Sequence, residues 1–484
     1  MKRILVILTG FLMLSAGSCS QTGSADVTTA VPENTGTSSI APTKSGEEIN
    51  LTVAVMNGDY FDIERVAESF NAEDNGYHVE LVPFIEEVHD EDGFPITPDI
   101  GEYQGADFSL VQEIINGDSV DIVGSFSFSN EAKYELLRKK GAFVDLYQFM
   151  ENDDEVNRET LNSHVLSLKE NDGHLYTLPT FYQINTLAGE EKYVGSERNW
   201  DIDSFMSHWN AMPDNTMING ARCAEYTYYV VLRSELESFV DYENAQVHFD
   251  SPDFRRLLEF CGTFESNHGE KLALDYDSPQ FVWETYIAGI MQAGSFRNWD
   301  SDEKITLVGY PSEDGSGAFM SDIGRCYSIN AKSSPEKQQG AWEFIRTFAT
   351  EEYQVNNVIE EYTSEEDGFN AAGKDVWYSA EFGLCVNDRA FDRVAQDIID
   401  YKYYDGKGVD KGEEYTYYIP VAEDVEKLKE YIETVDRWET RLDDALYNIV
   451  NDEIMAYFAG EKGLDETIEL IQNRAALWVS EQYG

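Results

Sequence analysis

The sequence has 484 residues, which is long enough for two or three domains or for one large two-part unit. Its 35 lysines and arginines stand against 92 aspartates and glutamates, so the formal net charge is −57 at pH 7. Because phosphate contacts need clustered cations, this balance excludes nucleic acid as a partner and argues against a flat association with anionic lipid. The acidic residues are spread along the chain, so we interpret them as a solvated surface.

The chain begins with Lys2 and Arg3, an apolar run over residues 4–14 and four small residues. The run is far shorter than the roughly 20 residues of a membrane-spanning helix, so this order predicts a secretory signal peptide over residues 1–18. The next residue, Cys19, makes the segment resemble a bacterial lipoprotein signal, in which the thiol carries a diacylglycerol and cleavage leaves this cysteine as the N-terminus. Such signals usually have leucine where Ala16 stands, and an ordinary signal peptide cleaved nearby is the alternative.

The following segment is rich in Ser, Thr, Gly and Pro and has almost no large apolar residue. Such a composition cannot bury enough surface to offset its ordering entropy, so residues 19–48 are predicted to form a disordered tether. Four further cysteines are widely spaced without any C-x-x-C pair, which excludes a zinc or thioredoxin-like motif: Cys223, Cys261, Cys326 and Cys385. Export permits disulfides among them, and buried thiols are the alternative.

The elements of the folded part begin with alternating apolar residues, which predict a strand over residues 49–55. An apolar stripe at helical spacing predicts a helix over 63–70, followed by a strand over 79–84. A helix over 110–115 and a short strand over 121–123 come next. This alternation of strands and helices predicts a parallel sheet with covering helices.

Two later helices are also predicted. Ser334 suits an N-cap and Pro335 the first helical turn, and an apolar stripe follows over residues 342–349. Apolar residues at helical spacing predict one long helix over residues 423–458 that packs in the core.

Seven segments resemble, in order, the motifs of the extracellular solute-binding proteins of ABC importers, a family typified by maltose- and oligosaccharide-binding proteins. Examples are GDSVDIV, similar to the family's G-x-x-x-D-[IV] strand, and DGHLYTLP, similar to its first crossing between lobes. The acidic, Tyr-rich residues 360–424 match no part of the family pattern. The seven segments cover residues 64–84, 117–123, 141–150, 172–187, 305–317, 329–354 and 458–481.

The resemblance implies an α/β, two-lobed periplasmic-binding-protein-like fold in which each lobe is a mixed sheet flanked by helices and the ligand cleft lies between the lobes. It implies a first lobe built from residues 49–179 and 309–375. The second lobe would comprise residues 180–308, completed by residues 376–484 with the C-terminal helices.

The function implied is that of a lipid-anchored binding protein on the extracytoplasmic face of the cell membrane. A monomer would capture a carbohydrate, expected to be an oligosaccharide, by hinge closure and deliver it to the transmembrane permease subunits of an ABC importer. The resemblance implies neither cofactor nor metal. The chain has no H-E-x-x-H and no G-x-S-x-G, so no catalytic residue is predicted. The alternatives are a secreted carbohydrate-active enzyme, or a surface sensory or adhesion lipoprotein with the same fold.

The family's cleft residues come from strand ends and from positions just past the crossings. Several have a structural alternative: Trp283 and Phe296 could lie in the core, and Asn57 could serve a turn. Trp299 stands among polar residues, which favours exposure in a cleft. Matched position by position, the resemblance nominates Asn57, Asp59, Ser125, Tyr182, Gln183, Trp283, Phe296, Arg297 and Trp299 as ligand-binding residues.

Overall fold

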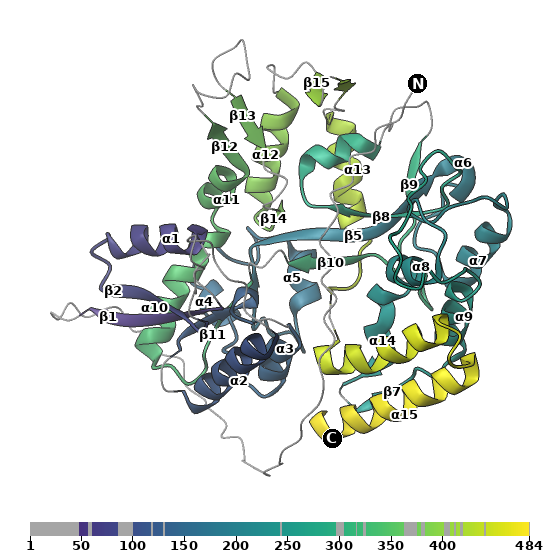
Figure 1. Ribbon diagram of the computed structural model, residues 1–484. Helices are drawn as coiled ribbons and strands as arrows, with labels where there is room; N and C mark the ends of the chain where they lie inside the picture. Colours follow the sequence, from purple (N-terminus) through teal and green to yellow (C-terminus); the bar gives the residue numbers. More distant parts are fainter. Residues whose placement is uncertain are drawn as a thin grey trace, which may run out of the picture. The chain divides into compact units, whose positions relative to one another are not determined.

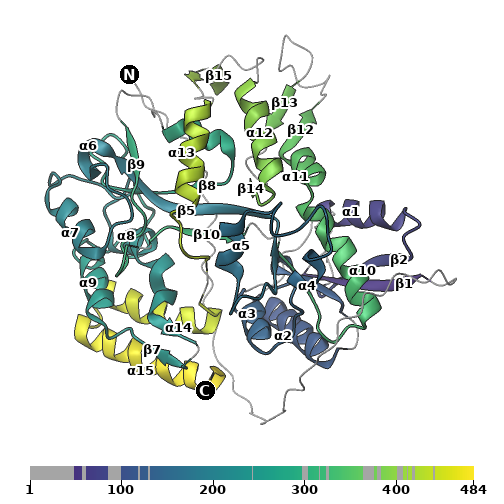
Figure 2. The ribbon, with the colours of Figure 1, turned by 180° about the vertical axis from the view of Figure 1, so that it is seen from behind.

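The computed structural model (Figures 1 and 2) describes residues 48–56, 61–85, 100–117, 120–128, 131–242, 244–296, 304–315, 317–322, 326–362, 375–378, 383–400, 407–410, 413–416, 420–439 and 442–483. These residues belong to one compact unit, Glu48–Gly484. The predicted signal peptide, Cys19 and the predicted tether up to residue 47 lie outside the described residues.

The first sheet has the strand order β2-β1-β3-β11-β4. β1 is parallel to β2 and β3, whereas β11 is antiparallel to β3 and β4. The predicted strand over residues 49–55 is confirmed as β1. The strands are β1 (Ile49–Val55), β2 (Tyr77–Pro83), β3 (Ile122–Gly124), β4 (Leu178–Pro179) and β11 (Cys326–Ile329).

Helices cover both faces of this sheet because β1 is apolar on both. Leu51 and Val53 point into the core formed with α1 and α10, while Ala54 packs against α2 and α3 on the other face. Alternation of side chains along a strand produces this division. The covering helices are α1 (Phe61–Asn71), α2 (Ile100–Asn116), α3 (Glu131–Lys139) and α10 (Pro335–Arg346).

α10 begins as its sequence predicts. The Ser334 side chain accepts a hydrogen bond from the backbone N–H of Lys337, and Pro335 occupies the first turn. Near its end, Arg346 and the Trp342 indole donate hydrogen bonds to Asp153, at 2.9 Å from Nη2 and 3.1 Å from Nε1. Although burial opposes ionisation, hydrogen bonds from Arg346 and from the backbone hold the pKa of Asp153 below its usual range.

The second sheet is built around β5, which pairs antiparallel with β10, β14, β8 and β9. Figure 1 shows it as the long strand that leads to α6. The strands are β5 (Phe181–Glu190), β8 (Trp283–Ile287), β9 (Ile305–Leu307), β10 (Phe319–Asp322) and β14 (Leu384–Cys385).

A separate core beside this sheet joins its helices. Large apolar side chains of α7, α8, α9, α14 and α15 pack there, and each fully buried one contributes roughly 1.5–3 kcal/mol of transfer free energy. The helices are α7 (Ile202–Asn210), α8 (Ala224–Val231), α9 (Pro252–Cys261), α14 (Asp444–Phe458) and α15 (Leu464–Tyr483).

The remaining elements connect these layers. They are η1 (Ser125–Ser127), α4 (Tyr147–Met150), α5 (Ser163–Lys169), α6 (Glu191–Val194), η2 (Arg233–Phe239), β6 (Val240–Asp241), β7 (Gln246–Val247), η3 (Ile290–Phe296), η4 (Thr347–Ala349), α11 (Glu351–Val358), β12 (Ile359–Tyr362), β13 (Asp375–Tyr378), α12 (Asp388–Asp400), β15 (Lys407–Asp410), β16 (Glu413–Thr416) and α13 (Ala422–Ile432).

The chain passes from the first sheet to the second between β4 and β5, and returns between β10 and β11. The long helix predicted over residues 423–458 is instead two helices, α13 and α14. Residues 437–439 between them run along β10: the backbone N–H of Met320 donates to the carbonyl of Arg437 at 3.0 Å, and the N–H of Glu439 donates to the carbonyl of Met320. Pairing with a sheet edge that would otherwise be unsatisfied outweighs the helical pattern here.

Two further findings concern the whole unit. No helix within the described ranges is long and apolar enough to cross a membrane. The four cysteines of the folded part are buried free thiols, which decides between the two possibilities that the sequence left open.

Candidate functional site

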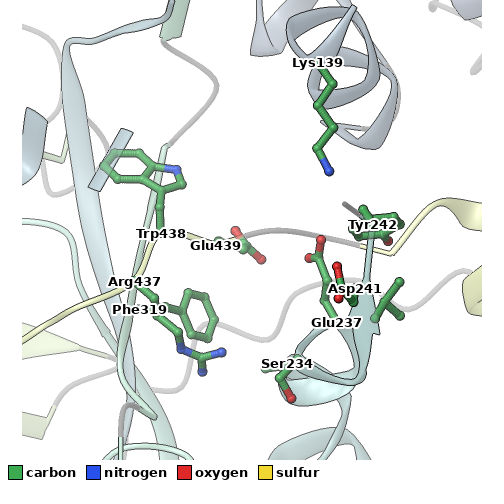
Figure 3. A pocket seen from close by; sticks show the side chains of 11 residues that line it. Lys139, Ser234, Glu237, Asp241, Tyr242, Phe319, Arg437, Trp438 and Glu439 are labelled. Carbon is green, nitrogen blue, oxygen red and sulfur yellow. The ribbon is translucent and has the colours of Figure 1, made fainter. Parts of the chain in front are cut away.

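A cavity of about 490 Å³ lies where α3, the η2–β6 segment, β10 and residues 437–439 meet. We call it the α3–β10 pocket. Figure 3 shows Lys139 entering from α3, with Trp438 and Arg437 on one wall and Glu237 and Tyr242 on another. The lining residues are Lys139, Ser234, Glu237, Ser238, Val240, Asp241, Tyr242, Phe319, Arg437, Trp438 and Glu439.

The walls of this pocket come from the surroundings of both sheets. Lys139 ends α3, which covers the first sheet, whereas Phe319 belongs to β10 of the second sheet. Residues 437–439 extend the edge of that second sheet. Ligand pockets occur preferentially at such junctions, and this volume lies within their usual range of roughly 300–1,000 Å³.

A buried ion pair holds one wall in place. Arg437 donates from Nη2 to the Glu235 carboxylate and to the carbonyl oxygen of Gly317, the latter at 3.0 Å. Its guanidinium also lies over the Phe319 ring, 5.1 Å from the centroid. Glu235 is only 1% exposed, and burial raises its pKa although the Arg437 charge opposes that shift.

Three hydrogen-bond donors of lining residues are buried without a partner among the described residues: Arg437 Nε, Trp438 Nε1 and Tyr242 Oη. Trp438 is 8% exposed, and its ring also receives Lys169 Nζ at 4.4 Å from the centroid. Burial, followed by the Glu237 charge, raises the pKa of Tyr242 well above its usual value, so its hydroxyl stays protonated. Buried polar groups are nearly always hydrogen-bonded, so these donors are suited to a bound ligand.

The pocket also carries charges of both signs. Glu237, Asp241 and Glu439 contribute carboxylates, and Lys139 contributes an ammonium that lies 4.9 Å from the Tyr242 ring centroid. Rings, donors and acceptors in one cavity fit a ligand with apolar C–H faces and a rim of hydroxyls.

One nominated residue lies next to the pocket. The register pairs Gln183 with Ser321 and Asn185 with Phe319, so these four side chains share one face of the second sheet. The Asn185 amide donates to Ser321 Oγ at 2.8 Å, and the Gln183 amide donates to Asn185 Oδ1 at 3.2 Å. Gln183 therefore stands one row along the strand from Phe319, which lines the pocket.

Three other nominated residues lie elsewhere. Tyr182, adjacent to Gln183 in β5, points to the opposite face, is 1% exposed and lines a different cavity. Ser125 accepts a hydrogen bond from the backbone N–H of Cys326 at 3.3 Å, which joins η1 to β11. Trp283 begins β8 and packs half-buried against the larger core. The structure does not bring these three together in the α3–β10 pocket.

The remaining nominations concern Asn57, Asp59, Arg297 and Trp299, which lie outside the described residues. Phe296 ends η3, and its side chain is likewise outside the description.

The pocket residues were missed because they are close only in the fold. Lys139 and Tyr242 belong to segments without a family motif, and Arg437 and Trp438 lay inside the predicted long helix. The one available signal was the cation–aromatic pair Arg437-Trp438 in a chain poor in cations.

Comparison with known proteins gives structural similarity alone. No protein-family model and no curated protein matches this sequence. A periplasmic oligogalacturonide binding protein from Yersinia enterocolitica has a similar structure, with 15% identity, a TM-score of 0.50 and coverage of 90% of this chain and 100% of that chain. An extracellular solute-binding protein family 1 member from Alicyclobacillus acidocaldarius is 12% identical, with a TM-score of 0.49 and coverage of 90% and 100%.

A de novo designed cysteine esterase is also similar, with 16% identity, a TM-score of 0.53 and coverage of 91% of this chain and 100% of that chain. The chain thus has an α/β fold similar to that of the Yersinia binding protein over about nine tenths of its length, in line with the fold that the motif resemblance implies. Because the designed esterase is similar as well, the fold alone does not exclude catalysis.

Proposed function

We propose that this chain is the substrate-binding component of an ABC importer and that it captures a neutral carbohydrate in the α3–β10 pocket. The observation that carries the proposal is the set of unpartnered donors on Arg437, Trp438 and Tyr242, next to the aromatic ring of Phe319. Sugar hydroxyls accept such hydrogen bonds, and the C–H faces of a sugar ring stack on aromatic side chains.

The charges favour a neutral sugar over an acidic one. Glu237, Asp241 and Glu439 supply three carboxylates, against the two cations Lys139 and Arg437. Arg437 is already paired with a buried glutamate, so it is a weak attractor for a further anion. The Yersinia protein is described as binding oligogalacturonide, an acidic sugar, and we do not extend that acidity to this chain.

The transport role rests on the fold and on the sequence resemblance. A protein exported by the signal peptide and held by lipid on Cys19 would meet its solute on the extracytoplasmic side of the membrane. The parts of the chain around the two sheets would close on the ligand by a hinge motion at the crossings, and the closed form would dock on the permease subunits. The lobe boundaries given above are part of this proposal.

A thermal-shift panel tests the proposal. Neutral oligosaccharides, oligogalacturonides and peptides are each added to the protein at equal concentration, with glycerol as the control solute. A ligand that binds only the folded state raises the melting temperature, so we expect neutral oligosaccharides to raise it by a few degrees. A rise in melting temperature with acidic sugars alone would overturn the assignment. A melting temperature that no sugar changes would overturn it as well.

The three carboxylates also make a carbohydrate-active enzyme the second candidate, because glycoside hydrolysis uses two facing acids. Chromatography of the bound sugar after prolonged incubation separates the two functions. We expect the sugar to be recovered intact, whereas shortened products that disappear in a Glu237→Gln variant would establish the enzyme.

A further inference from the structure

A second cavity, of about 450 Å³, lies between α12 and α13, which run side by side in both Figure 1 and Figure 2. We call it the α12–α13 pocket. It is on the opposite face of β5 from the Gln183 row, so it is separate from the α3–β10 pocket. The lining residues are Asn162, Tyr182, Asp388, Phe391, Asp392, Glu426, Lys429, Glu430, Ile432 and Glu433.

The floor of this pocket is apolar except for one hydroxyl. Tyr182, Phe391 and Ile432 are 1%, 5% and 2% exposed. The Tyr182 hydroxyl makes no hydrogen bond within the described part of the chain, although the side chain is almost wholly buried and lines the cavity. Burial, then the nearby Cys385, Asp388 and Glu433, raises its pKa, so the hydroxyl remains protonated and can both donate and accept.

The rim is strongly acidic. Five carboxylates surround one cation, Lys429, which is paired with Asp392 at 2.7 Å and lies 3.7 Å from Glu426. That pairing leaves an excess of negative charge around Asp388 and Glu433. Burial and the charges of Asp392 and Glu433 raise the pKa of Asp388, and they outweigh the hydrogen bond from the Asn162 amide and the Lys429 charge, which lower it. An added cation would relieve this repulsion.

The geometry also indicates which kind of cation fits. Within the described ranges, no group of three or more His, Cys, Asp or Glu side chains is placed to hold a metal ion. Dispersed carboxylates above an apolar floor suit instead an ion with a long apolar part, since methylenes can cover Phe391 and Ile432 while the charged ends reach the rim.

We propose that the α12–α13 pocket binds a small aliphatic amine, with an ammonium group held by Asp388, Glu433 and the Tyr182 hydroxyl and with the methylene chain over the floor. The ammonium donates a hydrogen bond to the oxygen of the Tyr182 hydroxyl, and it places a positive charge between like-charged carboxylates. This site is independent of the sugar proposed for the α3–β10 pocket.

The test is a calorimetric titration of the intact protein with 1,4-diaminobutane, compared with the neutral 1,4-butanediol. We expect saturable binding of the diamine at one site and none of the diol. An Asp388→Asn, Glu433→Gln double variant should weaken binding by about tenfold or more, because two charge-assisted contacts are lost. A Tyr182→Phe variant should weaken it by about fivefold.

The matched control is an Asp397→Asn, Glu352→Gln double variant, which removes the same charge from exposed positions outside the pocket. It should bind the diamine as the natural protein does. Equal weakening in both double variants would show attraction by net charge only, and would overturn the site. Absence of saturable binding would overturn it too. If the double variant does not fold, Glu433→Gln alone is compared with Glu352→Gln alone. The Glu433 side chain is 61% exposed, so its substitution should leave the fold intact.

Discussion

At the scale of single residues, the α3–β10 pocket depends on the pairing of Arg437 with Glu235. Glu235 is buried, and its carboxylate is compensated by one guanidinium. Removing one partner of a buried pair leaves an uncompensated charge, which costs more than the pair itself contributes. Arg437 is therefore needed for the wall to form at all, apart from any contact that it makes with a ligand.

An Arg437→Met variant should lose about 3 kcal/mol of unfolding free energy at pH 7, measured by urea denaturation. The pKa of Glu235 is raised in the fold, so the folded state takes up a proton before the unfolded state does as the pH falls. Without the Arg437 charge the folded pKa of Glu235 rises further, so the destabilisation is complete above the variant's folded pKa and shrinks as the pH falls from there toward the folded pKa of the natural protein.

A double variant, Arg437→Met with Glu235→Gln, is the control, and it should recover part of the lost stability. An equal loss at every pH, without recovery in the double variant, would show that Arg437 acts through packing rather than through the charge of Glu235.

At the scale of elements, each end of α3 contacts segments that pack around the second sheet. Lys133 pairs with Asp443, the N-cap residue of α14, at 2.7 Å. Lys139 lies over the rings of Tyr242 and Tyr483. These contacts join the two sides of the α3–β10 pocket. Lys139 and Tyr242 line the pocket, whereas Lys133 and Asp443 do not.

If closure accompanies binding, a contact of the closed form that does not touch ligand still contributes to affinity. A Lys133→Met variant should therefore bind the sugar about fivefold more weakly, the value of a partly exposed pair worth about 1 kcal/mol. Lys140→Met is the matched control, because Lys140 is exposed just beyond α3. Unchanged affinity in Lys133→Met, or equal losses in both variants, would argue against closure at this contact.

The elements also show which parts of the fold can be predicted from the sequence. Apolar periodicity predicts β1, α1 and the start of α10, because those signals are local. The same reasoning fails for residues 437–439, where pairing with β10 overrides a helical pattern. The family resemblance nominates both Gln183 and Tyr182, although neighbours in a strand face opposite sides. Which of the two lies beside the α3–β10 pocket depends on how the second sheet packs, and local sequence does not show that.

At the scale of the whole molecule, an acidic unit with a proposed binding role is attached to a proposed lipid anchor. The net charge of −57 keeps such a unit away from anionic lipid surfaces, so its membrane association would depend on lipid at Cys19. A Cys19→Ser variant should move from the membrane fraction to the medium, measured by immunoblotting of both fractions. A variant that stays with the membrane would show that another part of the chain holds it there.

The central claim is that the α3–β10 pocket binds a neutral sugar, and calorimetric titration of the protein and of Trp438→Phe with neutral oligosaccharides tests it most directly. The substitution keeps an aromatic ring and removes the unpartnered Nε1 donor. We predict one-to-one binding by the natural protein and about five- to tenfold weaker binding by the variant, the value of one hydrogen bond, with little change in melting temperature. Binding of equal strength by both proteins, or no binding of any neutral sugar by the natural protein, would contradict the account.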